Sequence, residues 1–201
     1  MSDETATQLQ ALSDRLGRIE TALAKLTDRQ EILDCLTRYS RGLDRHDEEM
    51  IASAFHEDAL DHHGDFIGDP RELAVWGNAL HAQSFDAHQH FLTTHTADID
   101  GDSAHTETYW LAVLRRKENG RSVMIGGRYV DRLERRDGVW KIVVRRTVME
   151  SIAEGERPEF ARWQYYVKGT WDHDDISFVR PLTLDLPRNV PTVGGKVVVE
   201  S

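Results

Sequence analysis

Apolar residues in the N-terminal part of the chain recur every three or four positions, which is the spacing of one helix face. The first stretch alternates spacings of three and four, as in the a and d positions of a heptad repeat: Leu9, Leu12, Leu16, Ile19, Leu23 and Leu26. This pattern is shorter than the three to four heptads of a coiled coil. It therefore predicts an amphipathic helix over residues 1–27 that packs on its own domain or on a partner subunit.

A second helix is predicted to begin near Asp28. The segment Thr27-Asp-Arg-Gln30 has the form of a capping box, in which Thr27 is the N-cap and Gln30 reaches back to its backbone. Apolar positions then continue with helical spacing at Ile32, Leu36, Tyr39 and Leu43. The pattern thus predicts two helices joined at residue 27.

Two shorter helices and one strand are expected next. The first helix covers residues 48–55, and a short strand follows around residues 59–62. The segment Asp69-Pro70-Arg71-Glu72 places Asp at an N-cap, Pro at the first helical position and Glu in the first turn. It predicts a helix that runs to about Ser84.

From His88 onward the pattern changes to β-rich runs, at residues 88–99, 103–117, 121–135 and 139–152. Each gap between them holds a glycine beside Asp or Asn, and Asn119-Gly120 and Asp137-Gly138 favour tight hairpins. An antiparallel meander is therefore expected. Helices followed by strands indicate an α+β fold, in which the helices pack on one face of a curved sheet and enclose a cone-shaped pocket.

The pattern ends after Glu156. Residues 157–175 hold five aromatic side chains among charges, which suggests a short helix that covers the pocket or docks on a neighbour. Residues 181–201 are rich in Pro, Gly and Val and are expected to form an extended arm. The predicted organisation is therefore an N-terminal helix (1–27), an α+β domain (28–155) and a C-terminal extension (156–201).

Charge and cysteine content restrict the function classes. The net charge of the 201 residues is -10, which argues against nucleic acid or an anionic membrane surface as partner. The single cysteine, Cys35, cannot form an internal disulfide and is expected to be a small buried residue of a protein in a reducing compartment. The acidic N-terminus does not resemble a secretory signal and no apolar run is long enough to span a membrane, so a cytoplasmic location is expected.

The candidate chemistry lies in two separated segments. Asp44 follows the predicted second helix, with Tyr39 five residues earlier, and His90 opens the first long strand. If the fold brings Asp44 against His90, the pair forms a general base with its orienting partner. The residues alone leave other interpretations open: Asp44 could begin a turn, and His90 and Tyr39 could be core residues.

Seven short motifs in a fixed order resemble the SnoaL-like group of the nuclear-transport-factor-two-like superfamily. They cover about residues 28–152: Tyr39-x4-Asp44, Phe55-His-Glu-Asp58-Ala59, Gly68-Asp-Pro70, His90-x4-His95, Asp100-Gly-Asp102, Ile125-Gly-Gly-Arg-Tyr129 and Arg135-Arg-Asp-Gly-Val-Trp-Lys141. The resemblance is greatest to the branch of scytalone dehydratase, bile acid 7α-dehydratase and hexachlorocyclohexane dehydrochlorinase. It implies an α+β barrel whose curved antiparallel sheet wraps around the N-terminal helices.

The resemblance also implies roles for individual residues. Asp44 and His90 match the dyad of the lyase members, and Tyr39 matches a tyrosine that assists in several dehydratases. Arg145 falls where the dehydrochlorinase has a pocket arginine. Trp110 is a candidate for an apolar pocket wall, together with Tyr109, Phe91 and Trp76. Bile acid dehydratase carries a further acidic residue on the second strand of the meander, which the segment Tyr109-Trp-Leu-Ala-Val113 lacks.

These roles favour a cofactor-independent lyase that acts on a hydrophobic, ring-containing small molecule, by dehydration or by loss of halide or formaldehyde. The alternatives are an isomerase in the same pocket, a non-catalytic ligand-binding domain and a structural subunit like the small subunit of ring-hydroxylating dioxygenases. Histidines at positions 62, 63, 81, 88 and 90 invite a metal, but no HExxH or paired-cysteine motif is present, so none is expected. A homo-oligomer, either dimer or trimer, is expected.

Overall fold

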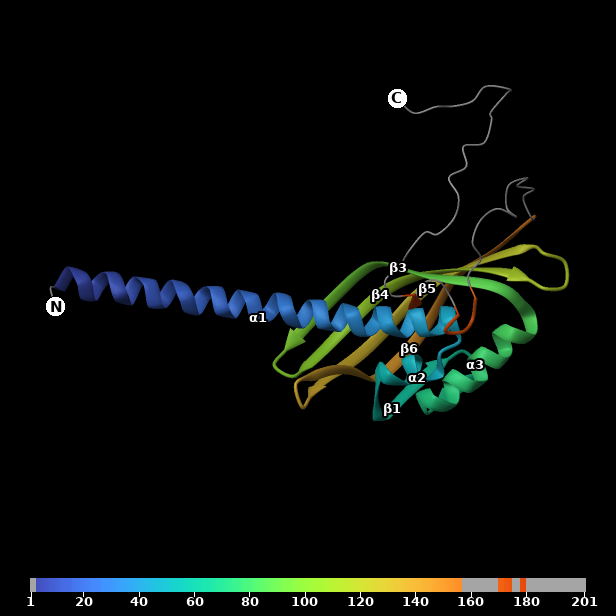
Figure 1. The fold of residues 1–201 in the computed structure, drawn as a ribbon, viewed down its shortest axis with the longest axis horizontal. Helices are drawn as coiled ribbons and strands as arrows, with labels where there is room; N and C mark the ends of the chain where they lie inside the picture. The colour runs from blue at the N-terminus through green and yellow to red at the C-terminus, as the bar shows by residue number, and fades with distance from the viewer. Residues whose placement is uncertain (1–2, 157–169, 175–177, 180–201) are drawn as a thin grey trace, which may run out of the picture.

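The computed structural model describes residues 3–156, 170–174 and 178–179. Three helices and six strands are present in this part of the chain. The helices are α1 (Asp3–Arg45), α2 (Glu48–Ser53) and α3 (Pro70–Ser84). The strands are β1 (Phe55–His63), β2 (Phe66–Gly68), β3 (Phe85–Asp100), β4 (Ser103–Arg116), β5 (Ser122–Arg136) and β6 (Val139–Gly155). The α+β class, the four-strand meander and the helix that begins after Asp69 are confirmed (Figure 1).

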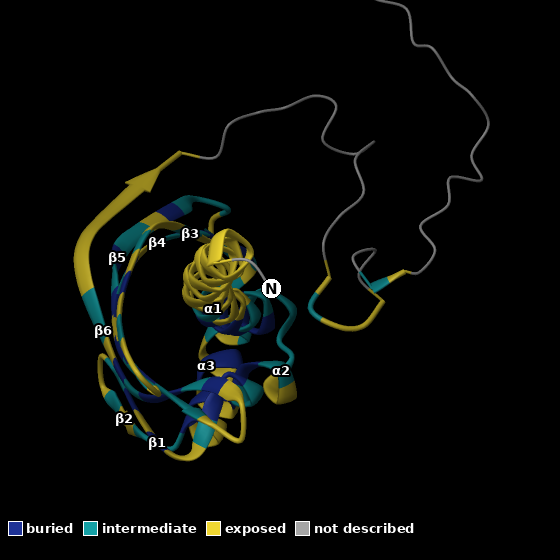
Figure 2. Cartoon of the chain, turned by 90° about the vertical axis from the view of Figure 1, so that its left-hand side faces the viewer, coloured by how far each residue is buried: buried dark blue, intermediate teal, exposed yellow. Residues whose placement is uncertain are grey.

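The expected curved sheet around the N-terminal helices is confirmed, but it is unclosed and mixed rather than wholly antiparallel. Its strand order is β2-β1-β6-β5-β4-β3, so β2 and β3 form two separate edges. The strands from β3 to β6 are antiparallel neighbours, whereas β1 runs parallel to β6. The sheet curves around α1 and α3 (Figure 2). The parallel pair joins strands far apart in the sequence, and such pairing leaves no local signal in either strand.

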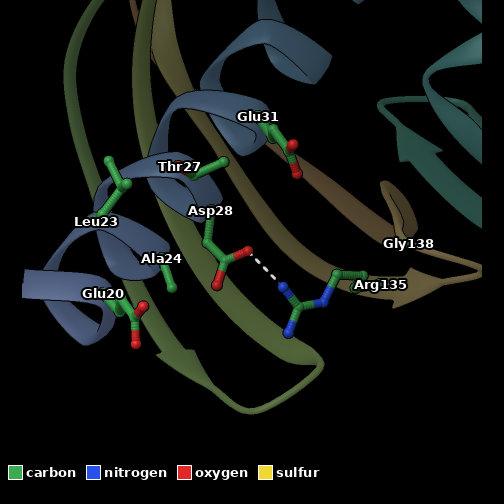
Figure 3. Close-up of a pocket in the computed structure, with 8 residues that line it drawn as sticks. All are labelled: Glu20, Leu23, Ala24, Thr27, Asp28, Glu31, Arg135 and Gly138. Atoms are coloured by element: carbon green, nitrogen blue, oxygen red, sulfur yellow. Dashed lines mark hydrogen bonds and ion pairs between the residues drawn. The ribbon is translucent and has the colours of Figure 1, made fainter. Parts of the chain in front are cut away.

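α1 is one continuous helix of 43 residues, and the predicted helix start at Asp28 is wrong. Gln30 does not reach back to Thr27, because its side-chain amide donates to Asp34 Oδ1 at 2.8 Å. Asp28 instead accepts from Arg135 at 2.6 Å (Figure 3). It also accepts from the Trp140 indole at 3.0 Å. No glycine or proline lies between residues 25 and 31, so the backbone has no cause to leave the helix there.

The two ends of α1 have different surroundings. The C-terminal part is buried against the sheet through Ile32, Cys35, Leu36, Tyr39 and Leu43. The N-terminal part projects beyond the sheet (Figure 1) and is largely exposed (Figure 2). Its six heptad positions are 52 to 65% exposed: Leu9, Leu12, Leu16, Ile19, Leu23 and Leu26. This apolar stripe does not pack on the described part of its own domain.

A close contact between α1 and α2 fixes the end of α1. A Cβ atom at Gly42 would lie 2.8 Å from the backbone nitrogen of Ile51, so only glycine allows this approach. The Asp47 side chain then caps α2 by accepting from the backbone N–H of Met50 at 2.8 Å. These contacts position Asp44, which lies in the last turn of α1.

Most of the C-terminal extension lies outside the described residues, including most of the predicted covering helix and the extended arm. Of the described part, Trp171 stacks on His46 with ring centroids 4.0 Å apart. His173 bonds to the Asp47 carboxylate at 3.0 Å. Among the described residues, no helix is both long enough and apolar enough to cross a membrane.

Candidate active site

Asp44 and His90 contact each other, and the contact joins the end of α1 to the edge strand β3. His90 Nδ1 lies 2.7 Å from Asp44 Oδ1. The backbone N–H of His90 also donates to the same carboxylate, at 3.0 and 3.1 Å from its two oxygens. The side chains are only 6% and 16% exposed, for His90 and Asp44 respectively. The carboxylate thus holds both the backbone and the ring of His90.

This contact defines the tautomer of the imidazole. A carboxylate accepts, so Nδ1 carries the proton and Nε2 carries a lone pair in the neutral ring. Within the described residues no hydrogen bond engages Nε2. A hollow of about 350 Å³ lies beside the pair, between α1 and β3, with walls that include Ser40, Arg41, Phe91 and Leu92. An imidazole held by a carboxylate therefore lies beside this hollow.

Arg145 lies deeper, on β6, and is completely buried. Its guanidinium makes two parallel hydrogen bonds to Asp131, each 2.8 Å long. It also lies between the rings of Tyr39 and Tyr129, with 4.2 Å to each centroid. One nitrogen, Nη1, has no hydrogen-bond partner among the described residues. Arg145 is therefore a fixed interior cation with one donor group left over.

Tyr39 is the α1 residue that meets this arginine. Its ring makes edge contacts with Phe55 and Tyr129, both at 5.6 Å between centroids. Its hydroxyl is buried and has no hydrogen-bond partner among the described residues. Burial, with smaller contributions from Tyr129 and Asp61, raises the pKa of Tyr39 well above its usual value. The hydroxyl therefore keeps its proton at neutral pH and can donate it in a hydrogen bond.

Trp110 is the one buried side chain of the expected aromatic wall. It is 7% exposed and stacks on Tyr129 with 5.5 Å between centroids. Gly127 leaves room for it, because a Cβ there would lie 2.9 Å from the indole ring. Tyr109, Phe91 and Trp76 are 45, 45 and 38% exposed and lie at the surface.

Asp61 on β1 is an interior acid that is not among the predicted site residues. It pairs in register with Arg145, is completely buried, and neither of its oxygens has a hydrogen-bond partner among the described residues. Burial raises its pKa to about 7, an effect that Arg145 opposes and Asp131 reinforces. The sequence indicates a short strand near Asp61, but it does not indicate that this strand pairs with β6. Arg145 could therefore not be recognised as the neighbour of Asp61 from the sequence.

Three histidines gather beside the dyad: His46 after α1, His81 on α3 and His88 on β3. Their ligand atoms all lie within 4.8 Å of one another. Burial lowers the pKa of His81 to about 3 and of His88 to about 2, with further lowering by neighbouring histidines. His88 and His81 were considered for a metal from the sequence, whereas His46 was not. Asp44, His88 and His90 form a second group with the same spacing.

The fold and the matched sequence together define the class of protein. The SnoaL-like domain family matches residues 24–146, and the chain belongs to this family. No curated protein sequence matches the chain significantly.

Solved structures with the same fold include enzymes and proteins of unknown function. A hexachlorocyclohexane dehydrochlorinase from Novosphingobium barchaimii is 24% identical, with a TM-score of 0.63, over 70% of this chain and 98% of that one. A putative scytalone dehydratase from Novosphingobium aromaticivorans is 20% identical, with a TM-score of 0.59, over 67% and 94%. A protein of unknown function from Mycobacterium tuberculosis is 26% identical, with a TM-score of 0.56, over 62% and 77%. These similarities support the fold.

Proposed function

We propose that the protein is a lyase that carries out a β-elimination on a hydrophobic, ring-containing small molecule, with His90 as base and Asp44 as its orienting partner. The observation that carries the proposal is the 2.7 Å contact between His90 Nδ1 and Asp44 Oδ1. An unperturbed imidazole titrates near neutral pH, where a general base is most effective. The two structural neighbours named as dehydrochlorinase and putative dehydratase carry names that denote eliminations, which adds support.

In the proposed step, His90 Nε2 takes a proton from the carbon next to the one that bears the leaving group. The electron pair of the broken C–H bond forms the new C=C bond, and the leaving group departs with its own bonding pair. The imidazolium that results is stabilised by the Asp44 carboxylate. For a hydroxyl leaving group, the proton on Nε2 then passes to the departing hydroxide and forms water; for a halide, the proton passes to solvent. Either transfer restores the base.

The interior residues supply the other half of the proposed reaction. Tyr39 offers a protonated hydroxyl and Arg145 the two N–H groups of Nη1, and both side chains are desolvated. Donors fixed before the reaction stabilise negative charge on a leaving group more than solvent does. Asp131 and the two tyrosine rings hold Arg145 in place, so it provides charge without reorganising. Trp110 contributes an apolar surface for the substrate ring.

The test is a screen of cyclic β-halo and β-hydroxy compounds, followed by substitution of the dyad. Chloride release and loss of water, measured by ion electrode and mass spectrometry, report the elimination. His90→Ala and Asp44→Asn are expected to lower kcat roughly 10²- to 10⁴-fold. His95→Ala is the matched control, since His95 lies on the same strand and bonds instead to Thr108. Turnover retained in either dyad variant contradicts the proposal, and a product of unchanged mass identifies an isomerase.

A further inference from the structure

We propose that His46, His81 and His88 form a binding site for one divalent transition-metal ion. The three imidazoles come from three separate elements: the turn after α1, the last turns of α3 and the start of β3. Their candidate ligand atoms all lie within 4.8 Å of one another. Nitrogens on one tetrahedral zinc ion lie about 3.3 Å apart, so small side-chain rotations are enough to close the site.

The polar atoms of this cluster lack partners. Both ring nitrogens of His88, Nδ1 of His81 and Nε2 of His46 are buried and have no hydrogen bond within the described residues. His88 itself is only 4% exposed. A buried polar group without a partner is unfavourable, and here three imidazole rings with such groups lie close to one another. A metal ion bound to all three rings would satisfy one nitrogen of each.

The chemistry of the cluster selects the class of ion. Three imidazoles and no thiolate suit zinc, cobalt or nickel, whereas calcium and magnesium prefer oxygen ligands. Trp171 covers the cluster, with its ring centroid 4.0 Å from that of His46 and 5.0 Å from that of His88. Such an apolar cover limits access of water to a bound ion.

The proposed metal site adjoins the base but does not include it. His90 has its Nδ1 engaged by Asp44, and neither residue is among the three ligands. The elimination proposed above therefore needs no step through the metal, and the two proposals can fail separately. Metal binding is measured without any substrate.

The experiment uses the untagged full chain after treatment with a chelator. Isothermal titration with Zn²⁺ is expected to show one high-affinity equivalent, and Co²⁺ is expected to give the visible d–d bands of a tetrahedral site. His46→Ala and His81→Ala are each expected to weaken Zn²⁺ binding by about 10²-fold or more. His95→Ala should bind as the wild type does, and circular dichroism checks that every variant is folded. Absence of a stoichiometric Zn²⁺ site in the wild type, or binding unaffected by both substitutions, overturns the proposal.

A second inference rests on a different region. We infer that the projecting part of α1 pairs in parallel with the same segment of a second copy of this chain. The six exposed apolar residues occupy alternating a and d positions, with Leu9, Leu16 and Leu23 at a. A stripe of this kind is self-complementary, because each side chain fits between those of an identical helix.

The charges that flank the stripe favour a parallel over an antiparallel pair of helices. With Leu9 and Leu16 at position a, Arg15 occupies position g and Glu20 occupies position e of the next heptad. In a parallel pair, position g of one helix faces position e of the next heptad in the other, so Arg15 meets Glu20 of the second copy twice by symmetry. An antiparallel pair brings g against g and e against e, which gives no opposite charges here.

Light scattering of full-length variants tests this pairing. The wild type is expected at a multiple of its 23.0 kDa mass, and Leu16→Asp combined with Ile19→Asp is expected to lower that mass. Thr21→Asp, on the opposite face of the same exposed segment, is the control and should change nothing. Ile19→Cys should form a disulfide between copies on mild oxidation, because only a parallel pair brings the two positions within bonding distance. An unchanged mass in the double variant, or no cross-link, overturns the inference.

Discussion

The two parts of α1 carry the same apolar spacing but have opposite surroundings. Ile32 and Leu36 are at most 1% exposed, whereas Leu16 and Leu23 are 56 and 60% exposed. The difference comes from the sheet, which buries α1 from Ile32 onward, and Arg135 and Trp140 bind Asp28 close to that boundary. Periodicity identifies which side chains share a face, but the length of the opposing layer decides whether that face is buried.

The largest expected difference in stability is between two variants that truncate one leucine in each part of α1. Leu36→Ala removes a side chain from the closely packed core and is expected to lower the free energy of unfolding by about 2–5 kcal/mol. Leu16→Ala should change it by about 0.5 kcal/mol or less, because the side chain is already exposed. Chemical denaturation at a protein concentration low enough to keep the chain monomeric measures both. Equal losses would show that the exposed stripe is covered within the monomer.

The next effect concerns the buried charges that face the C-terminal part of α1. Asp61 has a pKa of about 7 in the folded protein against 3.8 for an exposed carboxyl. As pH rises from about 4 to about 7, the unfolded chain releases this proton while the folded chain retains it. This group therefore lowers the free energy of unfolding over that range, by on the order of 4 kcal/mol in total, and no further above pH 7.

Asp61→Asn removes this titration while keeping the shape of the side chain. The difference in free energy of unfolding, variant minus wild type, is expected to increase as pH rises from 4 to 7. Urea denaturation at several pH values measures this difference. Glu57→Gln is the control, since Glu57 lies on the same strand and its side chain is 93% exposed. Parallel pH profiles for the wild type and Asp61→Asn would show that Asp61 is ionised across this range.

The smallest expected effect lies at the junction between the two parts. If α1 is continuous, Thr27 is an interior helix residue, and Thr27→Ala should stabilise the protein by a few tenths of a kcal/mol. If a helix began at Asp28, the same substitution would remove an N-cap and cost about 1 kcal/mol. Asp69→Ala provides the comparison, because Asp69 caps α3 by accepting from the Arg71 backbone at 2.8 Å. Similar losses in both variants would restore the two-helix interpretation.

Local features were well predicted from the sequence. The turns at Gly101, Gly120 and Gly138 all have positive φ, so the glycines that separate the β-rich runs serve the hairpins as expected. The Asp69-Pro70 start of α3 was also correct. In each case the signal and the structure it specifies lie within a few residues of each other.

Long-range features were predictable only in part. The contact of Asp44 with His90 was expected from family resemblance, since neither segment alone specifies the other. The parallel pairing of β1 with β6, and with it the row of Asp61, Arg145 and Asp131, has no local signal. The gathering of the three histidines depends on the packing of α3 against β3 and was missed for the same reason.

The hydrogen bond from the His90 backbone to Asp44 also covers part of the free edge of the sheet. β3 has a neighbour on one side only, and an open strand edge can recruit strands from other molecules and start aggregation. α1 occupies that edge: Asp44 accepts from the His90 backbone N–H, and Arg29 donates to the Ala97 carbonyl at 3.0 Å. The carboxylate that orients the imidazole therefore also removes a template for β-sheet growth, and its loss would expose the protein to self-association through β3.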